Sequence, residues 1–445
     1  MYTSPLQTVY NREKPIVQDR TTIDLPLTYP NRLIVYYFGR PIDLTNFEHP
    51  GGNFLHQFNG KDITNWVLNA HHSDRSGKVA KLIKLRTCYD LPNKPMTVDS
   101  YTLSQKIDEY AKISLSMVNS YVINRIIEYL LLFSACFYFS ESARIVQVIL
   151  CVIVFRSVFT IHDFGHWSVL QNAKWDTVVC RILSILFLGF DAFPTSRQHF
   201  IHHAFPNVLN NDTALETGVF VWHENYLIKD SYLARAFVDV QWFFWYTLIP
   251  ILGTLSQLLH GKIDVSTKDW LDYLPFLFLG FIRWFSLAFF FDFHPLHILN
   301  YVLIPTFLGF GFPCFVAQLN HFHMEIHDED KFKYTGFIET MISSTQDSFV
   351  DIPFLEQYLS IEILSWFFGG LNSHAAHHLF SMVHSDSLSI INAKVNTWIG
   401  KPFHNDCLTK VLYKSFEKIR NPLEHPKHAK KISKLGKRKD SAIIL

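Results

Sequence analysis

The chain has 445 residues, of which 49% are hydrophobic and only 18% charged, and phenylalanine alone occupies 41 positions. This composition excludes a disordered, collagen-like or low-complexity chain, and the charged fraction lies below the roughly 25% of soluble domains. Because 40 Lys and Arg residues face 39 Asp and Glu residues, no general positive field favours nucleic acid. The six cysteines lack CxxC pairing, so we expect them to be reduced and buried. The 23 histidines are clustered, and the clusters indicate where a functional site lies.

The beginning of the chain predicts a small soluble unit. The opening MYTSPLQTVYNREKP is polar, so we expect no secretory signal there. Glycine and proline recur throughout residues 30–90 and predict turns, with mixed polar and apolar residues between them. We expect residues 90–99 to form a linker.

The motif HPGG at residues 49–52 is the first with chemical content. Proline fixes φ and the two glycines allow a sharp turn, which presents His49 rigidly. About two dozen residues later, His71 or His72 can face His49 across a slot. Two neutral imidazoles on opposite sides of a flat macrocycle are what a six-coordinate haem iron needs.

The segment DLTNFEHPGG, followed by GKDIT and AHH, resembles the cytochrome b5 domain over about 60 residues. The resemblance implies a small α+β haem-binding domain in residues 1–95, with its core in 30–90. It also implies that His49 and either His71 or His72 are the axial ligands of a b-type haem, and we favour His71. A haem with two histidine ligands has no open position, so this domain would supply electrons and would not act on substrate.

Six apolar runs follow, several of them approaching the length of about 20 residues that crosses a bilayer. Single charges interrupt some runs, at Glu128, Arg156 and Arg283, which predicts that these helices face a protein interior. The basic tail, residues 421–445, is expected to be disordered, either near an anionic cytoplasmic leaflet or simply solvated. The runs are residues 126–139, 145–161, 179–193, 242–259, 271–291 and 298–318.

Three histidine motifs have helical spacing. Residues at i, i+3 and i+4 share one face of a helix, so each motif can direct its imidazoles to one point. Imidazole suits zinc, copper and iron, and zinc sites usually have four ligands or fewer, so eight or nine imidazoles indicate two metals. The eight residues are His162 and His166; His199, His202 and His203; and His374, His377 and His378.

The segments HDFGHWSV, HFIHHAFPN, AQLNHFHMEI and GGLNSHAAHHLF resemble, in order, those of the membrane di-iron desaturases and hydroxylases. Together with the N-terminal segment, they resemble the front-end fatty acid desaturases. The resemblance implies an all-α membrane domain at residues 96–420, with about four transmembrane helices and a cytosolic histidine-rich di-iron cap. It implies the eight motif histidines and His321 as iron ligands. We expect Asp163 and Asn207 to orient ligand rings, and we treat His323 and His327 as non-ligands.

The chain departs from the front-end pattern at two positions. His374 stands where those enzymes have glutamine, and Ser381 stands where proline is usual. Imidazole is the better iron ligand, so metal binding is not threatened, but regioselectivity and substrate class stay open. A divergent branch, the cytochrome b5-related proteins of insects, would fit these departures.

Convergence of the motifs constrains the topology. The haem domain and all three motifs must lie on one side of the bilayer, so two spans precede His162 and an even number lies between His203 and His374. One of the runs 242–259, 271–291 and 298–318 must therefore be interfacial, re-entrant or joined to its neighbour. We expect four spans, with residues 179–193 along the surface.

The resemblance implies a lipid desaturase of the endoplasmic reticulum membrane, with its N-terminus and histidine motifs cytosolic. It would introduce a double bond into an acyl chain carried by CoA or phospholipid, using O₂ and electrons from NADH-cytochrome b5 reductase. A sphingolipid desaturase or a hydroxylase on the same scaffold stays open. A non-catalytic membrane electron carrier is the third reading, but the complete set of motif histidines speaks against it.

Overall fold

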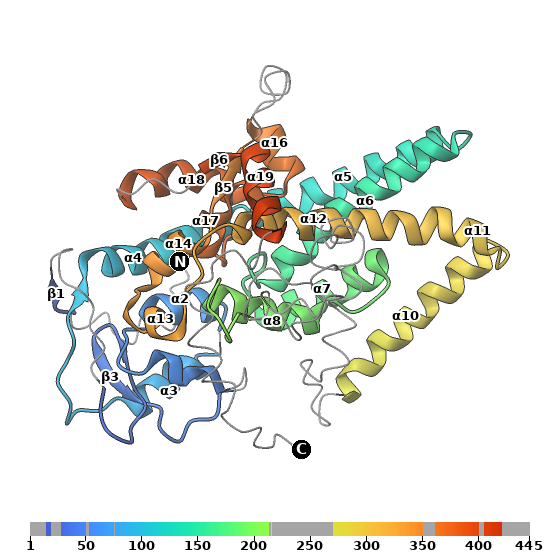
Figure 1. The fold of residues 1–445 in the computed structure, drawn as a ribbon. Helices are drawn as coiled ribbons and strands as arrows, with labels where there is room; N and C mark the ends of the chain where they lie inside the picture. The colour runs from blue at the N-terminus through green and yellow to red at the C-terminus, as the bar shows by residue number, and fades with distance from the viewer. Residues whose placement is uncertain are drawn as a thin grey trace, which may run out of the picture.

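The structure is a computed structural model that describes residues 15–18, 28–49, 53–74, 76–212, 215, 270–349, 361–399 and 405–420. The turn at 50–52, the apolar run 242–259 and the basic tail lie outside the described residues. Most of the described chain is helical. Figure 1 shows a small N-terminal unit beside a layer of short helices, from which long helices extend away.

A hairpin begins the N-terminal unit. Strands β2 (Ile34–Tyr37) and β3 (Arg40–Asp43) pair antiparallel, leaving a two-residue loop. Both loop residues have positive φ, as a tight hairpin turn requires, and a Cβ on Gly39 would lie 2.2 Å from the carbonyl oxygen of Lys94. The remaining elements are η1 (Asn53–Phe58), α2 (Thr64–His71), α3 (Lys78–Arg86) and the parallel pair β1 (Val17–Gln18) with β4 (Met96–Thr97).

Three described helices are long and apolar enough to cross a membrane. Two of them, α5 (Val118–Tyr138) and α6 (Ala143–Gly165), form a hairpin. The third is continuous over Pro295–Phe322 and comprises α11 (Pro295–Ile298), η4 (Leu299–Leu303) and α12 (Ile304–Phe322). It follows the apolar helix α10 (Trp270–Phe290), with which it forms a second hairpin. Both hairpins project to the same side in Figure 1.

Buried charges join the long helices, as the sequence predicted for two of the interrupted runs. Arg156 of α6 pairs with Glu128 of α5 at 2.5 Å, and their side chains are 1% and 8% exposed. Arg125 also pairs with Glu128, at 2.9 Å, and reaches Asp386 at 3.1 Å. Charges inside an apolar helix are tolerated when they are paired away from lipid, so this network fixes the faces along which the helices pack.

The other elements form the layer that meets the long helices. One hydrophobic core cluster runs through both the N-terminal unit and this layer; it includes Trp66, Phe205 and Phe380. The two parts therefore share a core. The elements of the layer are α4 (Val98–Ser116), α7 (Ala173–Leu188), α8 (Phe193–Ala204), α13 (Glu329–Tyr334), α14 (Phe337–Ser344), β5 (Asp347–Phe349), α16 (Ile361–Phe367), η5 (Leu371–Ser373), α17 (His374–Leu379), α18 (Ser385–Ile399), β6 (Asn405–Cys407) and α19 (Leu408–Arg420).

Candidate metal centre

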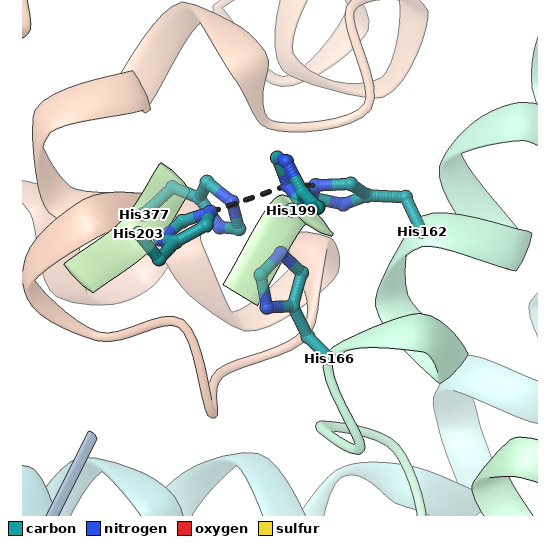
Figure 2. A group of neighbouring side chains, drawn as sticks. All are labelled: His162, His166, His199, His203 and His377. Carbon is teal, nitrogen blue, oxygen red and sulfur yellow. Dashed lines mark hydrogen bonds between the residues drawn. The ribbon is translucent and has the colours of Figure 1, made fainter. Parts of the chain in front are cut away.

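The nine histidines that the sequence nominates as metal ligands lie together. They form two groups in which each member offers a ring nitrogen within 4.8 Å of the others, and His374 adjoins the second group. In Figure 2 the larger group converges from three parts of the chain. The larger group is His162, His166, His199, His203 and His377, and the smaller is His202, His321 and His378.

Helical spacing explains how each motif contributes. His162 lies in the last turn of α6 and His166 caps that helix, so their rings lie one turn apart and meet edge to face, with centroids 4.5 Å from each other. The other two motifs divide between the groups. In α8, His199 and His203 face the larger group while His202 faces the smaller one. In α17, adjacent residues also separate between the two groups.

The distances between ring nitrogens fit shared metal ions. Two nitrogens bound at right angles to one metal, at about 2.1 Å each, lie about 3.0 Å apart. In the larger group, Nε2 of His199 lies 2.9 Å from Nε2 of His162 and 3.2 Å from Nε2 of His203. In the smaller group, Nε2 of His321 lies 3.2 Å from Nε2 of His202 and 2.7 Å from Nε2 of His374.

Burial leaves these imidazoles in the form that binds metal. The pKa values of His166, His203 and His378 lie well below the usual range because burial disfavours the charged ring and neighbouring imidazoles add repulsion. The pKa values of His199, His374 and His377 are lowered for the same reasons. Both ring nitrogens of His166 and of His378 are buried without a hydrogen-bond partner among the described residues. Neutral rings with unused lone pairs fit metal ions.

Hydrogen bonds orient two rings of the smaller group. The carboxylate of Asp212 lies 2.9 Å from Nδ1 of His202, and the carbonyl oxygen of Ser344 lies 2.8 Å from Nδ1 of His321. A proton held at Nδ1 leaves the Nε2 lone pair directed at the metal position. Sequence reasoning missed Asp212, although it is the sole acidic residue between Ala192 and Leu215.

The two residues expected to orient rings do something else. Asp163 stays 4.0 Å from Nδ1 of His162 and instead accepts hydrogen bonds from the Tyr121 hydroxyl, at 2.9 Å, and from Ser385 Oγ, at 2.6 Å. Its carboxylate is occupied in joining α5, α6 and the first residue of α18. Asn207 donates to the backbone carbonyl oxygen of His321, at 2.9 Å. It therefore holds the backbone of a proposed ligand, whereas we expected it to contact an imidazole ring. Both expectations were wrong in this respect.

Two further histidines lie outside both groups. Nε2 of His323 lies 2.7 Å from the amide oxygen of Gln346, and Nε2 of His327 lies 2.8 Å from the Ser343 hydroxyl. Hydrogen bonds to neighbouring side chains therefore occupy one nitrogen of each ring.

A second histidine arrangement lies in the N-terminal unit. The rings of His49 and His71 face each other, with centroids 6.1 Å apart. Two metal–nitrogen bonds of about 2 Å each, plus the ring radii, separate the centroids of two axial imidazoles by roughly 6 Å. The centroid separation of this pair, whose ring planes are tilted by 59°, matches that spacing. Both residues are half-buried, and the adjoining turn at 50–52 is outside the described residues.

His72 has a different environment from His71. It is 7% exposed, its Nδ1 lies 3.3 Å from the carbonyl oxygen of Asn69, and burial lowers its pKa to about 4. It lies near enough to His166 to contribute to the lowered pKa of that ring. The structure therefore brings His71 to His49, and places His72 on the side of the metal-binding groups.

Comparisons with known proteins give a consistent result. The family profile described as "Fatty acid desaturase" matches residues 142–397, which include every histidine of the two groups. The chain is 25% identical over 367 residues to the "Acyl-lipid (8-3)-desaturase" of Thraustochytrium sp, covering 76% of this chain and 80% of that protein. It is 22% identical over 358 residues to the "Fatty acid desaturase 2-like protein FADS2B" of Mus musculus, covering 75% and 69%. It is 22% identical over 389 residues to the "Delta(8)-fatty-acid desaturase" of Euglena gracilis, covering 82% and 88%.

Proposed function

The chain belongs to the fatty acid desaturase family, and from that premise we propose that it is a membrane di-iron enzyme of the front-end type that introduces a double bond into the acyl chain of a lipid. The convergence of nine histidines from α6, α8, α12 and α17, seven of them buried and two (His162 and His199) half-buried, is the observation that carries this proposal. The names of the similar proteins indicate fatty acyl chains as the substrate class.

The proposed ligands are divided between two iron ions. His162, His166, His199, His203 and His377 would hold one, and His202, His321, His374 and His378 the other. Bound iron supplies, with O₂, the oxidising power that an unactivated C–H bond requires. The protein keeps the rings neutral, orients them through Asp212 and the Ser344 carbonyl, and excludes water by burial.

The overall reaction balances with two external electrons. Each of two neighbouring methylenes loses one hydrogen, which gives the double bond. The two hydrogens correspond to two electrons and two protons, which reduce O₂ together with two external electrons and two further protons. The O₂ is thereby converted to two water molecules. We assign delivery of the external electrons to a cytochrome b5 domain at residues 1–95 with a b-type haem between His49 and His71, reduced by NADH-cytochrome b5 reductase. The 6.1 Å ring pair supports this assignment.

We propose four spans in the membrane of the endoplasmic reticulum: α5, α6, α10 and the helix at Pro295–Phe322. Two hairpins project together in Figure 1, and the second helix of each returns to end on a proposed ligand, His162 or His321. Their outer faces are apolar, as lipid contact requires; exposed examples include Ile126, Leu130 and Phe281. The run 242–259 would then be the one that does not cross, and the desaturase domain would comprise residues 96–420.

Lipid analysis of cells expressing the full chain tests the proposal. We expect a new unsaturated acyl product that requires O₂ and disappears in His203→Ala, because that ring lies between both groups, 4.4 Å from His166 and 4.0 Å from His378 between centroids. His323→Ala is the matched control, since His323 lies on α12's C-terminal cap but outside the groups. It should retain the product.

The product also separates the readings. A hydroxylated acyl chain would identify the protein as a hydroxylase. A double bond in the sphingoid base would identify it as a sphingolipid desaturase. If cells that express the wild-type chain contain no new lipid, although the purified protein contains iron and haem, the enzyme assignment is contradicted.

A further inference from the structure

We propose that helix α2 is a fixed bridge between the N-terminal unit and the histidine groups, held in place by Asn69 as a positioning residue. The docking follows from contacts in the structure, whereas its purpose, electron delivery in one fixed geometry, rests on the proposed function. The bridge differs from a haem domain that swings on a flexible tether.

Asn69 joins α2 directly to the third histidine motif. Its Nδ2 donates to the carbonyl oxygen of His378 at 2.9 Å, and its Oδ1 accepts from both the backbone N–H and the hydroxyl of Ser381, each at 3.0 Å. Asn69 is only 4% exposed, so these bonds are shielded from water. A buried amide with its hydrogen bonds satisfied specifies one arrangement of the parts it joins, because any displacement leaves polar atoms unpaired.

One turn earlier, Trp66 makes a second contact. Its indole Nε1 donates to the carbonyl oxygen of Ala204 at 3.0 Å, the residue that follows His203. The indole also packs edge-on against Phe337, with centroids 5.1 Å apart. Helix α2 therefore touches the C-terminal ends of two of the histidine-bearing helices, α8 and α17.

Aromatic packing extends the interface beyond α2. Phe58 lies 5.0 Å from Phe205 and 5.9 Å from Phe332, between ring centroids. The ammonium of Lys61 donates to the carbonyl oxygen of Phe332 at 2.7 Å and lies 3.8 Å from the centre of its ring. Such a buried apolar interface with specific polar contacts is typical of permanent association.

The geometry of α2 places its two functions on opposite faces. At 3.6 residues per turn, Trp66 and Asn69 share a face, while His71 lies roughly 160° around the helix from Asn69. His71 accordingly faces His49, and Asn69 faces His378. The two side chains start only about 3 Å apart along the helix axis. His72, buried on the inner side, adds an imidazole at the same junction.

The connection between the two parts is also anchored. The segment expected as a linker is packed from Lys94 onward, although Asp90, Pro92 and Asn93 are exposed. The backbone N–H of Lys94 donates to the carbonyl oxygen of Gly39 at 2.7 Å, and its ammonium donates to the carbonyl oxygen of Gly60 at 3.0 Å. Met96 is 1% exposed and lies in β4, and Thr97 caps α4. This segment therefore positions the N-terminal unit, where a free tether would only raise its effective concentration.

Substitutions on the full-length protein separate docking from local helix damage. Asn69→Ala removes the three contacts. Thr64→Val is the matched control, because Thr64 is also buried on the same helix but its hydroxyl oxygen accepts from the backbone N–H of Phe38, within the N-terminal unit. Ser381→Pro removes both donors to Asn69, whereas Ser381→Ala keeps the backbone donor.

Two measurements are made on each variant. Hydrogen exchange of residues 376–383 reports docking, and the rate at which pre-reduced haem is reoxidised, with O₂ and lipid substrate present, reports electron delivery. We expect Asn69→Ala and Ser381→Pro to raise that exchange and slow reoxidation roughly tenfold, the effect of losing one or two buried hydrogen bonds, with unchanged haem and iron contents. Thr64→Val should leave both readouts within about twofold of wild type.

The outcomes are distinguishable. Unchanged exchange in Asn69→Ala overturns the docking, and raised exchange with an unchanged reoxidation rate overturns the role of the bridge. If the wild-type protein binds no haem, the electron-supply part of the proposed function fails, and with it the purpose of the bridge. Exchange in residues 376–383 then still decides whether Asn69 holds α2 in place.

Discussion

His202 and Asp212 are joined by a contact of 2.9 Å between ring Nδ1 and carboxylate, while Nε2 of the same ring lies 3.2 Å from Nε2 of His321. One side of the imidazole is thus oriented by an anion and the other is directed at the position proposed for a metal. Both residues are buried, so water does not weaken the contact.

Asp212→Ala should therefore weaken binding of one of two irons by about 10- to 100-fold, the usual cost of losing a partner that orients a metal ligand. Asp212→Asn keeps an oxygen acceptor and should lose less. Iron retained per chain against a graded chelator measures this. Asp191→Asn, at an acidic residue paired with Arg181 away from the groups, is the control. Equal iron affinity in wild type and Asp212→Ala would contradict the assigned role.

Variants of His374 distinguish a metal ligand from a residue that only lies beside the metal. Its Nε2 lies 2.7 Å from that of His321, so His374→Ala should lose iron and activity together. Glutamine offers an oxygen or nitrogen to metal or to a bridging water, so His374→Gln should keep two irons and part of the turnover. Iron content of the two purified variants, measured side by side, distinguishes them. Full iron occupancy in His374→Ala means that His374 is not a ligand.

The haem assignment gives a spectroscopic prediction. His49→Ala and His71→Ala should each abolish the low-spin b-type spectrum, because the two rings face each other at 6.1 Å. His72→Ala should retain it, since that ring is turned toward Asn69. Visible absorption of full-length variants at matched concentration is the measurement. A spectrum lost only in His72→Ala would exchange the roles of the adjacent histidines.

Removing metal should lower stability. Ions that bind only the folded protein stabilise it by about 2.7 kcal/mol when free metal exceeds Kd by about 100-fold, and buried rings that lose their metal keep unused lone pairs. A chelator should therefore lower the melting temperature of the wild-type protein by a few degrees. His203→Ala, with one group disrupted, should respond less. An identical response in both proteins would show that the destabilisation does not come from these histidines.

The four-span arrangement predicts which segments are accessible. Tags or protease sites near Gly60, Asn210 and Asn372 should all be cytosolic. Glycosylation sites introduced at the two hairpin tips, near Ser140 and His294, should be modified in the lumen. In Figure 1 both hairpins project away from α8 and α17, which carry two of the histidine motifs. Glycosylation at any of the first three positions would break the convergence of the motifs.

The sequence by itself determined which histidines could come together in one site. The i, i+3, i+4 spacing of His199, His202 and His203 follows from helix geometry, which is local, and the number of imidazoles pointed to two metals before any contact was known. Hydropathy is also local, so the long helices of the hairpins were predicted from composition. Glu128 and Arg156 were likewise expected to face protein, because a charge in lipid is costly.

Tertiary structure alone decided how these parts meet. Spacing along a helix cannot say that His202 turns to one group while His199 and His203 serve the other, because this depends on where α12 and α17 pack. Asp212 was missed and Asp163 misjudged for the same reason. The contact of Asn69 with His378 joins residues 309 positions apart. No local pattern specifies such a pairing, since only the packing of the shared core determines which polar atoms are buried together and must satisfy one another.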